Sequence, residues 1–229
     1  MKTIKNIFYV IAVTFIISNA SFAQTSVSGG ADFVSRYVWR GFDFGNSASI
    51  QPELTLTTGG FEAGFWGSYP FTTASDYGEM DLYASYGVSD FSLLVTDYYF
   101  PAAGVKYGNY KDPGSHTIEL GLSYGGSESF PLSVSAYMNV YNDDDNTVYF
   151  ELGYSKEVSG VDLNLFVGGT PGGDAGFYGT TNFNLINIGI TASKDIKITD
   201  DFSLPIFSSY ILNPNSEIAY LVFGVSLGM

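Results

Sequence analysis

The sequence has no cysteine and few basic residues. The absence of cysteine in 229 residues excludes a secreted domain held together by disulfides, and with it zinc–thiolate and iron–sulfur sites. Lys and Arg total 9 against 23 Asp and Glu, a net charge of −14, which argues against nucleic acid as a partner because phosphates require a basic surface. Charged residues make up only 14% of the chain, less than the roughly 25% of ordinary soluble domains.

Long hydrophobic runs are also missing, apart from one short run at the start. Lys2 and Lys5 precede an apolar stretch at Ile7–Ile17, and Ser21-Phe22-Ala23 resembles a cleavage site with small residues at −3 and −1. The run is shorter than the roughly 20 residues that cross a bilayer as a helix. We therefore predict a signal peptide at 1–23 and a mature chain at 24–229, with an uncleaved anchor helix as the alternative.

Aromatic residues and glycine are plentiful: 18 Tyr, 19 Phe and 27 Gly. The mature chain alternates with period two, which is typical of strands with two different faces. Near the C-terminus, Leu221, Phe223 and Val225 share one face, and smaller residues such as Gly224 and Ser226 share the other. The pattern predicts twelve strands, near 27–40, 48–58, 61–70, 77–88, 91–101, 116–125, 132–142, 146–157, 161–170, 183–198, 202–213 and 216–229. The strands near 91–101 and 202–213 alternate too poorly for their faces to be assigned.

Short and long connections alternate along the chain. Short turns follow the even-numbered strands, and the longer connections, including 41–47, 71–76, 102–115 and 171–182, follow the odd-numbered ones. This asymmetry is typical of outer-membrane barrels, which have short periplasmic turns and longer extracellular loops. We predict an antiparallel up-and-down transmembrane β-barrel with both termini in the periplasm. A soluble β-sandwich or lipocalin-like barrel, with its apolar face inside, is the alternative.

The only two arginines are close together near the start of the mature chain. Arg36 and Arg40 share one strand face, and Tyr37 and Trp39 share the other. The barrel prediction places both arginines in the lumen and both aromatics in a lipid-facing girdle. Because guanidinium groups pair well with carboxylates, we expect a network across the lumen between the arginines and inward-facing acids. The candidates for this network and for a constriction are Arg36, Arg40, Glu53, Glu62, Asp81, Glu119 and Glu151.

The stretch Ser35–Gly41 has the form S-x-Y-x-W/F-R-G. It resembles the TorF family of porin-type Gram-negative outer-membrane proteins, and Phe42–Gly45 and Ser49–Pro52 resemble the continuation of that motif. The resemblance implies a barrel in the outer membrane. One departure is the final residue, Met229, where such barrels commonly end in an aromatic; we interpret it as a variation in the signal read by the barrel-assembly machinery.

Two motifs contain residue types that could catalyse a reaction or bind a metal. Ser115 and His116 are adjacent, so a strand would turn them to opposite faces, and barrel phospholipases have serine two positions after the histidine, where Ile118 stands here. We therefore expect no enzyme activity, no cofactor and no resident metal. Asp143–Asp145 is interpreted as a solvated acidic turn, with a divalent cation bridging lipopolysaccharide as the alternative.

These observations predict a monomeric outer-membrane channel for passive diffusion of small hydrophilic solutes or ions, leaning toward cations because acids dominate the lumen. Its expected partners are outer-membrane lipid and lipopolysaccharide, the diffusing solutes, and the assembly machinery during insertion. The alternative is a non-conducting barrel whose loops 102–115 and 171–182 adhere to or capture a ligand.

Overall fold

The structure, a computed structural model, describes residues 24–72, 78–111, 114–127, 129–173 and 175–228. The predicted signal peptide at 1–23 and the terminal Met229 lie outside the described residues. Within them, no helix is long and apolar enough to cross a membrane.

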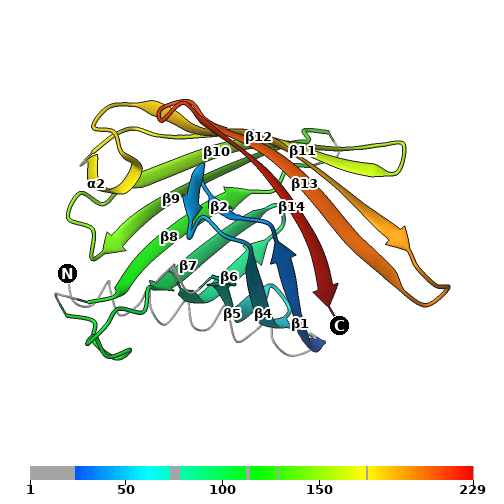
Figure 1. The fold of residues 1–229 in the computed structure, drawn as a ribbon, viewed down its shortest axis with the longest axis horizontal. Coiled ribbons are helices and arrows are strands. Elements are labelled where there is room, and N and C mark those ends of the chain that lie inside the picture. The colour runs from blue at the N-terminus through cyan, green and yellow to red at the C-terminus, as the bar shows by residue number, and fades with distance from the viewer. Residues whose placement is uncertain (1–23, 73–77, 112–113, 128, 174, 229) are drawn as a thin grey trace.

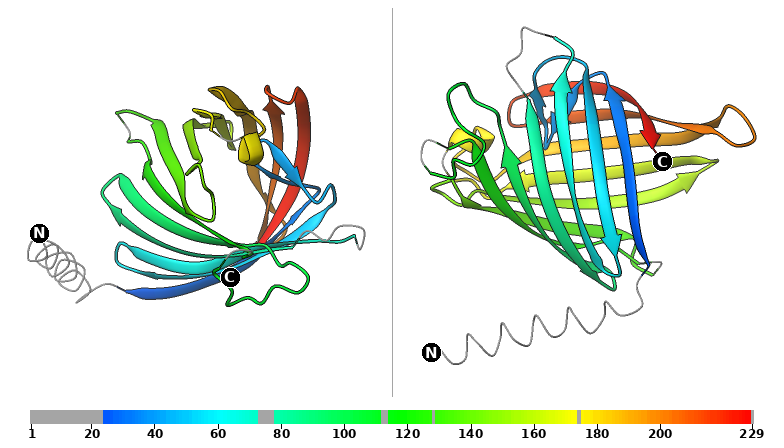
Figure 2. Two further views of the ribbon diagram at one scale, coloured as in Figure 1. Left: turned by 90° about the vertical axis from the view of Figure 1, so that its left-hand side faces the viewer. Right: turned by 90° about the horizontal axis from the view of Figure 1, so that it is seen from below.

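The described residues form a closed antiparallel barrel of twelve strands (Figures 1 and 2), which confirms the predicted fold class. The barrel strands are β1 (Thr25–Val34), β4 (Ser49–Thr58), β5 (Phe61–Pro70), β6 (Glu79–Val88), β7 (Phe91–Tyr99), β8 (His116–Tyr124), β9 (Leu132–Tyr141), β10 (Val148–Val158), β11 (Val161–Thr170), β12 (Asn184–Lys197), β13 (Ser203–Asn213) and β14 (Ile218–Gly228).

Closure depends on β1, which pairs with β4 on one side and β14 on the other. The β1–β4 ladder runs the full length of β1, from Thr25↔Thr58 to Val34↔Ser49. The β1–β14 ladder is half as long and involves only the second half of β1, from Gly30↔Gly228 to Val34↔Gly224. It continues one residue further because the Ser35 backbone N–H donates to the Phe223 carbonyl at 2.8 Å. We refer to this short ladder as the seam.

The two faces of the barrel differ as the alternation predicts. Cross-strand neighbours such as Leu54 and Phe65, or Leu82 on the next strand, lie in register on the outer face and are exposed. The inner face carries Gln51, Ser68 and many other polar side chains. Bulky apolar side chains outside and polar ones inside are the pattern of a membrane-spanning barrel, because the hydrocarbon then meets apolar atoms. The soluble alternative, with its apolar face inside, is excluded by this arrangement.

The two ends of the barrel differ in their connections. At one end, the turn end, the strands are joined by tight turns such as 59–60, 89–90 and 159–160. At the other, the loop end, lie the connections 35–48, 71–78, 100–115, 142–147, 171–183 and 214–217. The turns at 89–90 and 159–160 begin with Ser89 and Ser159, whose φ values are 55° and 54°; positive φ matches the right-handed twist of the flanking strands.

The prediction of one strand at 27–40 is wrong. The strand ends at Val34, and the chain then folds into the lumen as a hairpin of β2 (Tyr37–Trp39) and β3 (Phe42–Phe44), drawn inside the barrel in Figure 2. Arg40 and Gly41 form its two-residue turn with φ of 47° and 83°, as in a type I′ hairpin. A Cβ on Gly41 would lie 1.9 Å from the Ile186 carbonyl oxygen. We call β2, β3 and their turn the lumen hairpin.

A candidate constriction in the lumen

The lumen hairpin packs against a second inward-folded segment. The short helix α2 (Ala175–Tyr178) belongs to the connection between β11 and β12. Its Tyr178 is 3% exposed and forms a buried apolar cluster with two barrel residues, Tyr149 and Ile186. Trp39 and Phe42 of the hairpin pack against this cluster. Two loop-end connections that are far apart in sequence therefore meet inside the barrel.

Arg40 makes the central polar contact of this assembly. Its Nη1 and Nη2 donate to Glu119 Oε2 and Oε1 on β8 at 2.6 and 2.9 Å, and Nη1 also donates to the Tyr178 hydroxyl oxygen at 2.7 Å. The side chains of Arg40 and Glu119 are 8% and 3% exposed. Glu119 Oε1 also accepts from the Tyr98 hydroxyl at 2.9 Å. The forked geometry and the additional bonds satisfy a buried charge pair that would otherwise be costly.

Three aromatic rings surround the same guanidinium. The Arg40 Cζ atom lies 4.3 Å from the ring centre of Trp39, 4.5 Å from that of Tyr137 and 4.4 Å from that of Tyr149. Cation–π attraction of this kind is worth about 2 kcal/mol when the groups are desolvated. Arg40 thus joins the lumen hairpin to β8, β9, β10 and α2, and holds it across the lumen.

Arg36 has a more local role. It pairs with Asp43 of β3 and donates to the Asn46 side-chain oxygen at 2.8 Å, so its bonds stay within the 35–48 connection. Its side chain is 34% exposed. The two arginines therefore differ in burial and in the distance along the chain to their partners, although their shared strand face predicted the same role for both.

The other acids named from sequence are not brought to an arginine. Glu151 accepts from the Tyr149 hydroxyl and, at 3.0 Å, from Asn187 Nδ2. Asp81 is 6% exposed and lies on β6 two residues from Glu79, which is equally buried. Glu53 and Glu62 face the lumen closer to the turn end, opposite Trp66 and Thr57 in the β4–β5 ladder. Of the expected network, the described residues contain one pair that spans the lumen, Arg40–Glu119.

The predicted positions of Tyr37 and Trp39 are wrong. Neither belongs to a lipid-facing girdle, because β1 ends before them and the hairpin turns both inward. Tyr37 is 8% exposed, and its ring lies 5.3 Å from that of Trp66 on the inner face of β5. The Trp39 ring lies 5.7 Å from that of Tyr98.

The single histidine lies outside the lumen, at the loop end. His116 Nδ1 and Nε2 lie 2.9 Å from Asp97 Oδ1 and 2.6 Å from the Tyr107 carbonyl oxygen, and the ring stacks on Tyr110 at 4.0 Å. These contacts use both ring nitrogens to tie the 100–115 connection to β7 and β8. The neighbouring Ser115 is not a partner of the imidazole in these bonds.

The acidic turn at Asp143–Asp145 directs its first carboxylate onto its own backbone. Asp143 Oδ2 accepts from Asn139 Nδ2 at 2.8 Å and from the Thr147 backbone N–H at 3.0 Å, and Oδ1 accepts from the Asp145 N–H at 3.3 Å. Partial burial opposes ionisation, but the bonds from Thr147 and Asn139 outweigh it and lower the pKa of Asp143. The carboxylate therefore closes this turn.

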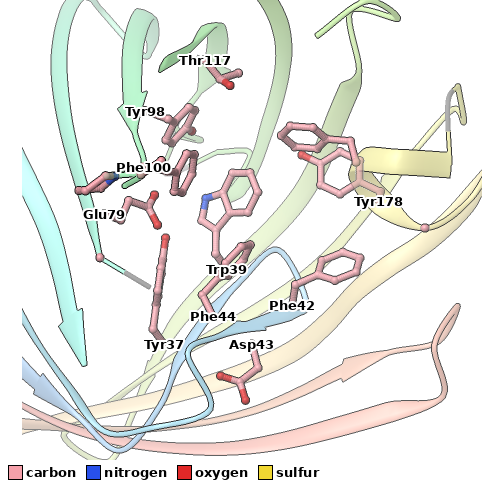
Figure 3. A pocket seen from close by; sticks show the side chains of 15 residues that line it. Tyr37, Trp39, Phe42, Asp43, Phe44, Glu79, Tyr98, Phe100, Thr117 and Tyr178 are labelled. Atoms are coloured by element: carbon pink, nitrogen blue, oxygen red, sulfur yellow. The ribbon is translucent and has the colours of Figure 1, made fainter. Parts of the chain in front are cut away.

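A cavity of about 740 Å³ lies between the lumen hairpin, α2 and the loop end of β6, β7 and β8 (Figure 3). We call it the aromatic vestibule. Its apolar lining includes Trp39, Phe42, Phe44, Phe100 and Phe177, and its polar lining includes Tyr37, Asp43, Glu79, Tyr98, Thr117 and Tyr178.

Comparison with known proteins gives a family. The sequence model described as "Bacterial protein of unknown function (Gcw_chp)" matches residues 19–203. The chain belongs to the Gcw_chp family. No curated protein matches it. This match does not confirm the resemblance to TorF proteins, which stays a prediction.

The solved structures that are similar to the Gcw_chp barrel include two porins and one outer membrane channel. It is 9% identical to the KdgM porin over 90% of this chain and 98% of that one, with a TM-score of 0.44. It is 16% identical to the COG4313 outer membrane channel from Pseudomonas putida F1 over 90% and 94%, also with a TM-score of 0.44. For the anion-selective porin from Comamonas acidovorans the identity is 11% over 90% and 98%, with a TM-score of 0.31.

Several residues at the centre of the Gcw_chp lumen were not predicted. Tyr98 lies on a strand whose alternation was too weak to assign, and Tyr178 lies in a connection treated as a loop. Glu79 had a usable signal, because it shares parity with Asp81 and both therefore face inward. Tyr149 likewise shares parity with Glu151, a signal that could have placed it in the lumen.

Proposed function

We propose that this Gcw_chp barrel is a channel for small hydrophilic solutes or ions, with the lumen hairpin as its constriction. The observation that carries the proposal is the hairpin itself, anchored across a polar lumen by the buried Arg40–Glu119 pair. Barrels of eight strands are filled by side chains, whereas those of sixteen or more leave wide aqueous channels. Twelve strands leave room for a narrow passage, and a folded-in loop sets its width.

The proposed location is the outer membrane of a Gram-negative cell, with the loop end outside and both termini in the periplasm. The apolar outer surface, the predicted signal peptide at 1–23 and the resemblance of Ser35–Gly41 to TorF proteins support this location. Lipid and lipopolysaccharide would then surround the barrel, and the barrel-assembly machinery would insert it.

We further propose a modest preference for cations. The two arginines are each paired, Arg40 with Glu119 and Arg36 with Asp43. Within the described part of the chain, no Lys or Arg pairs with Glu53, Glu62, Asp81 or Glu151. An excess of unpaired carboxylates along a pore attracts cations and repels anions.

Planar bilayer recording tests both parts of this proposal. Purified protein in a KCl gradient should give discrete conductance steps with a reversal potential of the sign expected for K⁺ over Cl⁻. Glu62→Gln should reduce that preference while leaving the steps intact, because it removes one lumen charge far from the hairpin. A protein that inserts without conducting would overturn the channel function, and a reversal potential of opposite sign would overturn only the cation preference.

A non-conducting binding barrel is the second candidate. It is favoured by the packing of the lumen hairpin against α2, which places Trp39 and Phe42 on the buried cluster in the lumen. Swelling of proteoliposomes in isotonic solutions of small sugars separates the two functions. Swelling supports a passage, and its absence together with the absence of conductance supports the binding barrel.

A further inference from the structure

The aromatic vestibule has a lining that the constriction alone does not require. Aromatic side chains from three separate segments converge on it: the lumen hairpin, the start of the 100–115 connection, and α2. The ring centres of Trp39 and Phe177 are 6.4 Å apart, and those of Tyr37 and Phe44 are 5.5 Å apart. A cavity of about 740 Å³ is within the range of sites that hold small organic molecules.

The charged groups on this lining are of one sign. Asp43 and Glu79 line the vestibule, and no Lys or Arg is among the lining residues in the part of the chain that the structure describes. Glu79 is 6% exposed, and Figure 3 shows its carboxylate facing the Tyr37 hydroxyl across the cavity wall. Asp81, equally buried, lies two residues further along β6 and therefore on the same face of the strand.

Of these acids, Glu79 and Asp81 lack a compensating cation, whereas Asp43 is paired with Arg36. In the described residues Glu79 and Asp81 take part in no ion pair, and the Oδ1 atoms of Asp43 and Asp81 have no hydrogen-bond partner. Burying a carboxylate without a partner is costly, and two neighbouring carboxylates also repel each other. A positive charge entering the vestibule would relieve both costs.

We propose that the aromatic vestibule binds a small organic cation, an ammonium group with an apolar body. Aromatic faces attract such cations through their quadrupoles. Contact with the rings also removes the apolar part of the ligand from water, and Glu79 supplies the opposite charge. As a statement about the transported substrate, this inference rests on the channel function proposed above, whereas binding itself is measurable without conduction.

Choline and its neutral carbon isostere 3,3-dimethyl-1-butanol are suitable probes because they differ mainly in charge. Binding to the detergent-solubilised protein can be followed by calorimetry and by tryptophan fluorescence. The chain has two tryptophans: Trp39 lines the vestibule, and the Trp66 ring lies 5.3 Å from that of Tyr37. At about pH 8, choline should bind at least about tenfold more tightly than the isostere.

Two variants locate the site. Glu79→Gln should weaken choline about tenfold or more and leave 3,3-dimethyl-1-butanol unchanged. Phe177→Leu, which removes one aromatic face and leaves the charges in place, should weaken choline about two- to fivefold. Glu62→Gln is the matched control, because this lumen carboxylate lies near the turn end, away from the vestibule, and should change neither affinity.

Each outcome decides the proposal. Equal affinity for the two probes, no binding of either, or choline affinity that is unchanged in both Glu79→Gln and Phe177→Leu would overturn it. Bilayer recording on the same preparation tests the channel function independently of choline binding. Choline binding without conductance would refute the channel and retain the site, and conductance without choline binding would do the reverse.

Discussion

Replacing Arg40 with alanine should detach the lumen hairpin from the inner wall of the barrel without separating the barrel strands. Arg40 crosses the lumen to Glu119 with two bonds of 2.6 and 2.9 Å, whereas the barrel strands are held by their own ladders. Removing one member of a buried ion pair typically costs about 3–5 kcal/mol, because the other charge is left uncompensated. The loss of ring contacts around the guanidinium adds to this cost.

This magnitude predicts a large change in how often the hairpin detaches. Every 1.4 kcal/mol is a factor of ten, so 3–5 kcal/mol corresponds to roughly 10²–10³-fold or more in the population of the detached state. Hydrogen exchange of the hairpin amides at 37–44 should accelerate by about that factor, while exchange in the strands changes little. If the channel function holds, single-channel conductance should rise because the constriction is lost.

Arg36→Ala is the matched control, and Glu119→Gln completes the comparison. The Arg36 side chain is 34% exposed and that of its partner Asp43 is 9% exposed. Hairpin exchange should rise less than in Arg40→Ala, because the polar bonds of Arg36 stay within the 35–48 connection and do not hold the hairpin to the barrel. In the double variant Arg40→Ala with Glu119→Gln, exchange should be slower than the two single effects added together, since no lone charge remains. Hairpin exchange in Arg40→Ala that matches the wild type would refute the assigned anchoring role.

Three further changes test other parts of the structure. Gly41→Ala should detach the hairpin much as Arg40→Ala does, because a Cβ there would lie 1.9 Å from the Ile186 carbonyl oxygen and φ is 83°; unchanged hairpin exchange would contradict the turn geometry. The lowered pKa of Asp143 implies stability that is present above its ordinary value and lost as pH falls through the lowered one. The protection of the 142–147 amides, measured relative to the intrinsic exchange rate at each pH, should therefore fall in acid. Asp143→Asn, already weakly protected at neutral pH, should remove that dependence. Leu120→Arg on the outer face should destabilise the barrel in lipid by about 2–4 kcal/mol, measured by urea unfolding, whereas Ser123→Arg, toward the lumen, should cost far less.

The barrel could be predicted from the sequence because its physics is local and repetitive. Residues such as Leu120 and Leu122 alternate with Glu119 and Gly121, and the strand backbone converts that alternation into two faces without further information. The alternation of short and long connections predicted which end of the barrel carries the tight turns and which carries the loops. The number of barrel strands and the up-and-down order of their connections follow from these two patterns.

The hairpin was missed because its alternation continues that of the preceding strand. Phe33, Tyr37 and Trp39 share parity, so the pattern does not show that the strand ends at Val34. The deciding feature is the turn at Arg40–Gly41, and a lone glycine after arginine is a weak hairpin signal compared with Asn-Gly. Once the chain reverses there, aromatics that matched a lipid-facing girdle become lumen residues.

The sequence limits the candidate partners of Arg40 to a few carboxylates but does not identify which one it binds. Parity placed five acids in the lumen, and Glu119 is 79 residues away from Arg40. No local pattern encodes which of these carboxylates faces the arginine, because that depends on where the hairpin enters the barrel and on the closure of all twelve strands. The same dependence applies to Tyr178, which arrives from a connection without strand periodicity.

The position of the seam has a consequence for biogenesis. β1 runs directly into the lumen hairpin, and the seam ends where Phe223 of β14 meets Ser35. Asn213 Nδ2 donates to the Gly41 carbonyl oxygen at 3.3 Å, so the hairpin's docking surface includes β13, although Asn213 follows Gly41 by 172 residues. The lumen hairpin is translated long before β13 and can complete its docking only after β13 has formed. A nascent chain that lacks β13 and β14 should therefore carry an undocked hairpin.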